Sequence, residues 1–343
     1  MELELGRRQT EVGVLPKIVQ IVGAGLAGCA AAIAARREGS HVLLYEKSPF
    51  PRHKVCGEYL SPEIVPVLQD LGLWDDFQAA NPAPIRRLVL HFRNSQKRSQ
   101  LRAAAYGLSR YALDDLMLRR AISVGVRHEP APAPALLSGP VVLAHGRQTQ
   151  STKGTRLFGF KSHFEGPVND AVELFFFGQC YVGVNPVEGG VTNVCGLGPE
   201  ELLRAHDFDI DRVVQGCPQL AERLEPLRRK MKWLTVGPLV FANRFRGPSE
   251  PDRYPAGDAL SFVDPFTGSG MLSALTMGRL AGIAAARGTA VEEYVAECRR
   301  RLEKPFQFSS VIRAMLANGW AERLSAVIPA HLLVRLTRTH RAV

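Results

Sequence analysis

The sequence predicts an α/β fold with two β-sheets, one of them mainly parallel. A β-branched run at residues 18–22 stops at a glycine cluster and gives way to a small-residue helical pattern over residues 27–37. Residues 41–46 form a second buried strand pattern, so the three elements predict a βαβ unit with parallel strands. Residues 157–197 are strand-like around a Pro-Gly region, which predicts a second, antiparallel layer.

The remaining elements follow from the same periodicities. Helical patterns alternate with strand patterns, and a stretch rich in Pro and Ala is expected to be irregular. The sequence predicts helices over residues 62–77, 110–124, 199–229 and 270–287, an edge strand or hairpin over 86–106, a strand near 234–241, and irregular chain over 128–140.

Length and composition limit the possible classes of protein. The chain has 343 residues, 46% of them hydrophobic, which is enough for about two domains with apolar cores. Its six cysteines lie at least fifteen residues apart, so the spacing excludes zinc ribbons and ferredoxins, no metal site is predicted, and reduced thiols are expected. The sequence has neither a secretory h-region nor an uncharged apolar stretch of about 18 residues, which predicts a cytoplasmic protein.

The glycine cluster Gly23-Ala24-Gly25-Leu26-Ala27-Gly28 joins the first strand to the first helix. Gly23 permits a tight turn, Gly25 lets the backbone approach a pyrophosphate, and Gly28 allows close packing of helix on strand. Glu46, at the end of the next strand, would accept hydrogen bonds from ribose hydroxyls. The alternative is a glycine-rich turn without a ligand, but strand, helix and acidic residue together predict a dinucleotide site that also includes Leu26, Ala27 and Lys47.

A second glycine-rich region covers residues 256–259 and 264–271. It resembles the second FAD fingerprint of the p-hydroxybenzoate hydroxylase-like flavoproteins, in which an Asp binds the ribitol and a glycine-rich turn lies beside the flavin. A helix N-terminus near Gly270 would stabilise negative charge on a reduced flavin. The alternative is a loop before a packed Ala/Gly helix. The resemblance implies FAD contacts from Gly257, Asp258, Gly268, Gly270 and Met271.

Two further segments look like elements of geranylgeranyl reductases and related flavin oxidoreductases. Residues 51–58, Pro-Arg-His-Lys-Val-Cys-Gly-Glu, are similar to the element that runs along the isoalloxazine ring, which implies flavin contacts at Cys56 and Gly57. Residues 107–116 are similar to the element whose Arg contacts FAD, a role that falls to Arg110. An ordinary buried thiol and a surface ion pair are the respective alternatives.

The resemblance spans most of residues 17–290 and implies how the chain is divided. It implies a Rossmann-type, glutathione reductase-like FAD-binding domain with an interleaved mixed β-sheet substrate domain and a helical C-terminus. The FAD-binding domain would combine residues 1–85, 108–155 and 235–290; the substrate domain 86–107 and 156–234; and the C-terminal helical segment 291–343.

Three departures from the family pattern bear on function. His145-Gly146 stands where an Asp-Gly motif contributes to FAD and NADPH binding, and Arg110 lies only 35 residues before His145, which leaves little room for the usual β-hairpin. The Trp-x-Trp-x-Ile-Pro signature of flavin halogenases is absent, which argues against halogenation. In the predicted second layer, Gly183 stands where the family has a large Trp, and Phe160, Phe175, Phe177 and Tyr181 line either an apolar pocket or the sheet core.

The reaction that the resemblance favours is monooxygenation (hydroxylation) of a hydrophobic aromatic, polyketide or isoprenoid substrate through a flavin C4a-hydroperoxide, with NADPH or NADH as reductant. One alternative is a geranylgeranyl reductase-like reductase or dehydrogenase that exchanges hydride with a C=C bond. Another is a non-catalytic FAD electron-transfer subunit. His53, Cys56 and Glu58 are weak candidates for catalytic residues, and no general base is assigned.

The net charge of +10 is concentrated near the C-terminus. Residues 276–343 contain eleven Lys and Arg against five Glu, with apolar residues between the arginines. This pattern suits peripheral membrane contact, and a solvated helix packed on the FAD domain is the alternative. No nucleic-acid recognition motif accompanies the charge, so nucleic acid is not an expected partner.

Overall fold

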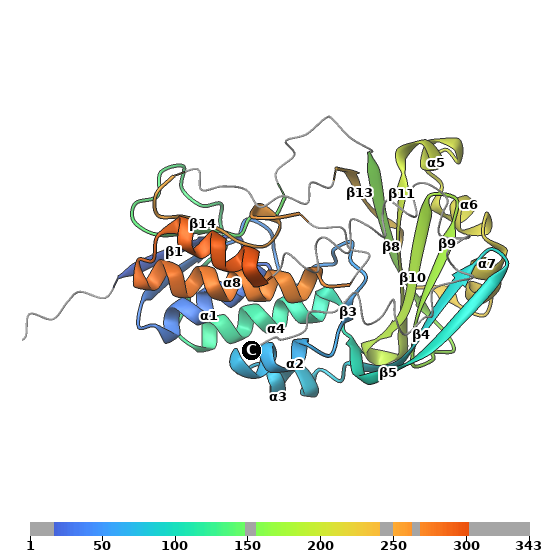
Figure 1. The fold of residues 1–343 in the computed structure, drawn as a ribbon, viewed down its shortest axis with the longest axis horizontal. Coiled ribbons are helices and arrows are strands. Elements are labelled where there is room, and N and C mark those ends of the chain that lie inside the picture. The colour runs from blue at the N-terminus through green and yellow to red at the C-terminus, as the bar shows by residue number, and fades with distance from the viewer. Residues whose placement is uncertain (1–16, 148–155, 241–249, 263–267, 302–343) are drawn as a thin grey trace, which may run out of the picture.

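The computed structural model describes residues 17–147, 156–240, 250–262 and 268–301, and these form two β-sheets that lie side by side (Figure 1). The basic segment beyond residue 301 and the predicted flavin-edge residues 263–267 lie outside the described residues. Among the helices described, none has the length and apolar character needed to cross a membrane.

The first sheet is parallel and carries the glycine-rich turn. Its strands lie in the order β14-β7-β1-β2-β6, and every pairing between neighbours is parallel. The predicted βαβ unit is therefore confirmed. The strands are β1 (Ile18–Val22), β2 (His41–Tyr45), β6 (Arg127–Glu129), β7 (Val141–Leu143) and β14 (Arg253–Pro255).

Helices α1 (Leu26–Arg37), α4 (Arg110–Ser123) and α8 (Gly270–Arg287) accompany this sheet (Figure 1). In α8, a Cβ at Gly278 or Gly282 would overlap backbone carbonyls of α1, so the small residues of the two helices allow their backbones to touch. The single helix predicted over 62–77 is instead a pair, α2 (Ile64–Asp70) and α3 (Trp74–Ala79). Residues 291–301 are also helical.

The second sheet is mixed. Its strands lie in the order β12-β8-β11-β10-β9-β4-β5-β3, with β13 paired to β8, and β4 runs parallel to β9 while the other pairs are antiparallel. The strands are β3 (Tyr59–Leu60), β4 (Ala83–Phe92), β5 (Ser95–Gly107), β8 (Leu157–Glu165), β9 (Ala171–Phe177), β10 (Cys180–Val187), β11 (Val191–Pro199), β12 (Arg228–Arg229) and β13 (Leu234–Leu239).

Three short helices cover one face of the second sheet, where a single helical region was predicted. They are α5 (Glu200–Ala205), α6 (Ile210–Gln215) and α7 (Pro218–Leu224) (Figure 1). Phe160 and Phe175 are fully buried between this face and the helices, together with Leu203 and Leu220. Of the two alternatives for these phenylalanines, the structure therefore supports sheet core over a pocket lining.

The opposite face of the second sheet is directed toward the segment between β2 and β3. Neighbouring strands place Lys161, Cys195, Gly183, Leu174 and Leu90 in one cross-strand row. Because partners in register point to the same face, the row runs from a charged end to an apolar end. At the apolar end Leu90 and Phe176 pack with Tyr181, so Tyr181 lies on the face where a pocket could form.

Candidate functional site

The glycine-rich turn has the geometry that the sequence predicts. Gly23 has φ of +100° and its N–H donates to the carbonyl of Tyr45 at 2.8 Å, while a Cβ there would press against Ala144. A Cβ at Gly28 would overlap the carbonyl oxygen of Gly23. At Gly25, by contrast, the space beside the backbone is open among the described residues except for Nζ of Lys54, 3.6 Å from the Cβ position.

Lys54 and Arg110 bring two positive charges to one buried carboxylate next to this turn. Nζ of Lys54 lies 2.6 Å from Oδ2 of Asp114, and Nε of Arg110 lies 2.6 Å from Oδ1. Burial alone would raise the pKa of Asp114, but the charges of Arg110 and Lys54 outweigh it and hold that pKa below its usual range. The group has one positive charge in excess beside the N-terminus of α1, an arrangement that favours an anion.

Asp258, in the 3-10 turn Gly257–Ala259, faces the same region. Solvent reaches this residue, and partial desolvation raises the pKa of its carboxyl, with the charges of Arg110, Arg147 and Lys54 opposing the rise. Asp258 and Arg110, both predicted to bind the cofactor, are thus close enough for their charges to interact.

Glu46 lies at the end of β2 and is almost fully buried. Its carboxylate accepts hydrogen bonds from the N–H of Ala24 at 3.1 Å and of Ser48 at 2.9 Å, and it pairs with Arg52 at 3.2 Å. These contacts fix the carboxylate beside the glycine-rich turn, as a ribose-binding role requires. Lys47 is exposed.

The other predicted cofactor-binding residues divide between core and surface. Leu26, Ala27, Gly257 and Met271 are buried in the packing around α1 and α8, so only their backbone could meet a ligand. Gly57 is exposed and Cys56 is half-buried. Gly270 begins α8, with open space beside it among the described residues, and Gly268 precedes it in a turn.

The segment Cys56–Gly57 is tied to the second sheet. Nδ2 of Asn193, on β11, donates to the carbonyl of Gly57 at 2.9 Å and to that of Cys56 at 3.3 Å. The following residue, Glu58, has φ of +52°, a left-handed conformation that costs a non-glycine residue about 1 kcal/mol. Contacts of the Glu58 side chain must compensate for this strain.

The carboxylate of Glu58 is fully buried and is held by three donors. Oε1 accepts from Nζ of Lys161 and, at 2.6 Å, from the N–H of Arg110, and Oε2 accepts from Nε2 of His163 at 2.7 Å. Burial alone would raise the pKa of Glu58, but the hydrogen bond from His163 and the charge of Lys161 hold it below its usual range. A buried, ionised carboxylate with these partners suits a structural role better than that of a general base.

His53, Glu58 and His163 have ligand atoms within 4.8 Å of one another, as a metal site would. However, both oxygens of Glu58 already accept hydrogen bonds, and Lys161 supplies the positive charge that a metal ion would provide. We therefore assign no metal. Nδ1 of His53 is buried without a hydrogen-bond partner in the described part of the chain, and burial, with the charges of Lys161 and His163, lowers the pKa of this imidazole.

Acidification is expected to destabilise the protein. The carboxyl pKa values of Asp114 and Glu58 are lower in the folded protein than their ordinary values of 3.8 and 4.5, which apply to the unfolded chain. The two ionised carboxylates therefore stabilise the fold fully above these ordinary values, and this stabilisation is lost as the pH falls through the folded-state pKa values. The lowered pKa of His53 acts in the same direction from pH 6.5 downward. Urea unfolding between pH 7 and pH 3 should show a decreasing free energy of unfolding, and an increase toward acid pH would contradict the assignment of these charges.

His145 and Gly146, which stand where the family pattern has Asp-Gly, lie just after β7, beside the glycine-rich turn. His145 is exposed, and its Nδ1 lies 2.9 Å from the carbonyl oxygen of Gly146. Residues 130–140, between β6 and β7, contain no strand, so the hairpin for which the sequence leaves little room is missing there. Where the family pattern has an Asp carboxylate, this chain thus has the imidazole of His145, at the same edge of the parallel sheet.

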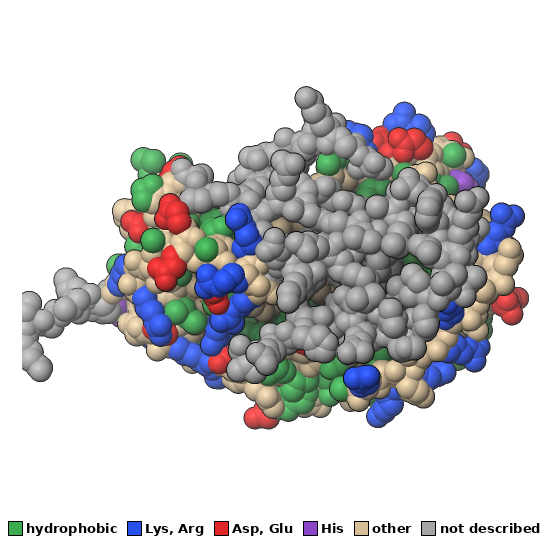
Figure 2. Space-filling model, viewed as in Figure 1, with side chains coloured by type: hydrophobic (Ala, Val, Ile, Leu, Met, Phe, Trp, Pro, Cys, Tyr) green, Lys and Arg blue, Asp and Glu red, His purple; other side chains and the backbone are tan. Residues whose placement is uncertain are grey.

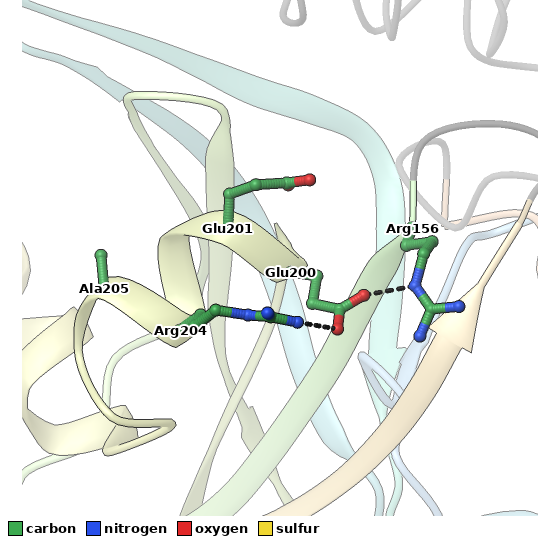
Figure 3. A pocket seen from close by; sticks show the side chains of 5 residues that line it. All are labelled: Arg156, Glu200, Glu201, Arg204 and Ala205. Atoms are coloured by element: carbon green, nitrogen blue, oxygen red, sulfur yellow. Dashed lines mark hydrogen bonds and ion pairs between the residues drawn. The ribbon is translucent and has the colours of Figure 1, made fainter.

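A separate pocket lies on the second sheet at α5 and the start of β8, lined by Arg156, Glu200, Glu201, Arg204 and Ala205 (Figure 3). Glu200 pairs with Arg156 and, at 2.7 Å, with Arg204. These charges satisfy one another on the protein surface, so this pocket offers little to a ligand. Elsewhere on the described surface in Figure 2, basic and acidic side chains are interspersed over the half that carries the first sheet.

Sequence reasoning missed Lys54, Lys161, His163 and Asn193 as site residues. A signal for two of them was present in β8, where Phe158, Phe160 and Phe164 alternate with Gly159, Lys161 and His163. Such alternation places charged side chains on one face of a strand whose other face is apolar. Only the tertiary structure shows that this charged face meets Glu58.

Comparison with known proteins supports a nucleotide-binding N-terminal region. Residues 21–53 match the NAD(P)-binding Rossmann-like domain. Squalene epoxidase erg1 of Aspergillus fumigatus is 37% identical over 76 residues, 22% of this chain and 16% of that protein. A menaquinone reductase of Mycobacterium tuberculosis is 51% identical over 55 residues, 16% of this chain and 14% of that protein. The chain thus matches less than a fifth of the length of either relative.

The likeness in three dimensions extends much further. The structure of the flavin-dependent brominase Bmp2 superposes with a TM-score of 0.77 and 19% identity, covering 94% of this chain and 93% of the brominase. At this identity the likeness shows the fold. It confirms the predicted α/β architecture, in which a Rossmann-type parallel sheet accompanies a second, mixed sheet.

Proposed function

Because the chain shares its fold with a flavin-dependent brominase and stretches of its sequence with squalene epoxidase and menaquinone reductase, we propose that it is an FAD-dependent oxidoreductase. The observation that carries the proposal is the pair of cations Lys54 and Arg110, which share the buried carboxylate of Asp114, with Nζ of Lys54 beside the open backbone of Gly25. Positive charge at a helix N-terminus suits a pyrophosphate, and the carboxylate of Asp258, on which both cations act, suits ribitol hydroxyls.

Under this proposal the residues of the first sheet hold the cofactor. Gly25, the first turn of α1 and Lys54 bind the pyrophosphate, and Glu46 binds the ribose. Cys56, Gly57 and the N-terminus of α8 lie beside the ring. FAD would supply two-electron chemistry and, when reduced, reactivity toward O₂. The proposed FAD-binding segments remain 1–85, 108–155 and 235–290, although β3 and β13 hydrogen-bond into the second sheet.

We favour a monooxygenase that acts on a hydrophobic small molecule. On the face of the second sheet opposite to α5, α6 and α7, the apolar end with Leu90, Leu174 and Tyr181 would exclude water and orient such a substrate. Squalene epoxidase and, at 26% identity over 102 residues, 6-hydroxynicotinate 3-monooxygenase of Pseudomonas fluorescens are among the relatives. A reductase is the second candidate, because the segment shared with menaquinone reductase has the higher identity, 51%.

Reoxidation kinetics separate the two candidates. The FAD-loaded protein is photoreduced without oxygen and mixed with air, while flavin absorbance and peroxide release are followed. A monooxygenase is expected to reoxidise rapidly, with a transient absorbance that substrate shortens. Slow reoxidation without a transient would favour the reductase. Bleaching of the flavin by NADPH or NADH, the proposed reductants, would count against a non-catalytic electron-transfer subunit.

Peripheral membrane contact remains a separate proposal. It rests on the basic C-terminal sequence, which extends beyond the described residues. Binding of the full chain to vesicles of anionic and of neutral lipids tests it. Cytoplasmic location without membrane association would be favoured if neither vesicle bound the protein.

Lys54→Met is expected to weaken FAD binding by about tenfold, because it removes a cation that faces the pyrophosphate while keeping the length of the side chain. The dissociation constant is measured by quenching of FAD fluorescence at fixed ionic strength. Lys232→Met is the matched control. Lys232 is exposed between β12 and β13 of the second sheet, so this variant should leave the affinity for FAD unchanged. Equal affinities for the two variants would place the pyrophosphate elsewhere.

A further inference from the structure

A buried charge cluster fastens the segment Cys56–Gly57 to the second sheet, and we propose that Glu58 is the positioning residue for this segment. The inference rests on the proposed FAD site, because residues 56 and 57 are those expected beside the flavin ring. Glu58 is fully buried and therefore acts through its neighbours rather than by touching a ligand.

The segment is held by two neighbouring strands of the second sheet. Asn193 donates to the carbonyls of Cys56 and Gly57, which fixes the backbone against β11. The side chain of Glu58 then reaches β8, where it meets Lys161 and His163. Since these partners belong to the second sheet, the cluster sets the distance between that sheet and the loop.

The backbone conformation of Glu58 depends on this anchoring. A φ of +52° at Glu58 is uncommon for a residue with a side chain, and it fixes the orientation of the peptide between Gly57 and Glu58. Without the charge cluster, relaxation to negative φ would rotate this peptide and move Gly57 with it. The same carboxylate also accepts from the N–H of Arg110, so the anchor extends to the first turn of α4.

The groups around Glu58 come from three elements. The side chains of Lys161 and His163 face it from β8, the backbone N–H of Arg110 donates to it from the start of α4, and His53, in the loop before it, packs against His163 with ring centroids 5.1 Å apart. Lys161 is itself fully buried, so its charge depends on Glu58 for compensation. A test must therefore remove both charges together, which leaves no isolated buried ion.

The sheet offers a matched control on its other face. Glu173 pairs there with Arg223 at 2.6 Å and with His91 at 3.1 Å, and its side chain is nearly buried. This cluster has the same chemistry as that of Glu58, a carboxylate between a histidine and a cation. It joins β4, β9 and α7 and does not touch the segment Cys56–Gly57.

The test compares Glu58→Gln/Lys161→Met with Glu173→Gln/Arg223→Met in the full chain. With FAD bound, visible circular dichroism and the reduction potential of the flavin are measured together with FAD affinity. We expect the first pair to change the dichroism and the potential with little loss of affinity, because the pyrophosphate site at Gly25 is intact. The control pair should change neither.

Alkylation of Cys56 gives a second readout that needs no FAD. The rate of iodoacetamide modification, followed by peptide mass spectrometry, should rise by about tenfold in the first pair because the segment opens more often, and should not rise in the control. If the first pair does not fold, Glu58→Asp, which keeps the charge and shortens the reach, takes its place.

Equal behaviour of the two pairs in both readouts would overturn the inference. Failure of the wild-type chain to bind FAD would instead contradict the proposed function. In that case the alkylation rates still decide whether Glu58 positions the segment.

Discussion

Gly28→Ala is expected to destabilise the protein by about 3 kcal/mol and to abolish measurable FAD binding. The added Cβ would overlap the carbonyl oxygen of Gly23, and this is a backbone atom that cannot move aside as a flexible side chain can. Helix α1 must therefore shift away from β1, which displaces the N–H groups that face the proposed pyrophosphate. The free energy of unfolding in urea and the binding of FAD are the two measurements.

Gly183→Ala is the control for this substitution. A Cβ at Gly183 would meet Leu174 at 3.4 Å and the carbonyl oxygen of Cys195 at 3.7 Å, which are ordinary packing distances. We expect its stability to remain within about 1 kcal/mol of the wild type and FAD binding to persist. Equal stability of the two variants would mean that α1 and β1 are not packed as closely as the structure shows.

The turn around Gly28 could be predicted because its chemistry is local. A strand, three glycines, a helix and an acidic residue follow one another within about 30 residues, and each has a physical function that fixes its place. That Asp258 and Arg110 belong to one site was predicted from the family resemblance and not from local chemistry, since 148 residues separate the two along the chain.

The faces of the second sheet were harder to predict. In a strand with apolar residues on both faces, the period of two does not reveal which face meets helices and which meets the other sheet. Phe160 and Phe175 thus fitted both a core, the commoner fate of an aromatic residue, and a pocket, and the positions of α5, α6 and α7 decide for the core. The pairing of Glu58 with Lys161 spans 103 residues and has no local signal beyond the charge itself.

Arg110 connects the two charge clusters of the molecule. Its guanidinium pairs with Asp114 beside the glycine-rich turn, while its backbone N–H donates to Glu58 at the second sheet. The proposed pyrophosphate site and the proposed anchor of the flavin segment therefore share one residue at the start of α4. A ligand that displaced the Arg110 side chain would disturb both of these sites, and the ion pair with Asp114 opposes such a displacement.

Asp114→Asn is expected to make the stability of the protein strongly dependent on FAD. Removal of the buried carboxylate charge leaves Lys54 and Arg110 without their counter-charge, which should cost about 3–5 kcal/mol in the absence of cofactor. If the pyrophosphate binds beside these two cations, its negative charge replaces that of Asp114. The rise in melting temperature on addition of FAD should then be larger in the variant than in the wild type.

Asp170→Asn separates this effect from a general loss of ion pairing. Asp170 pairs with Arg87 on the second sheet and both side chains are exposed, so the variant should lose less than about 1 kcal/mol and respond to FAD as the wild type does. Inorganic pyrophosphate, added in place of FAD, should reproduce part of the stabilisation of Asp114→Asn, because the rescue is electrostatic. If FAD stabilises all three proteins equally, Lys54 and Arg110 do not face the cofactor, and the excess positive charge at α1 serves the fold alone.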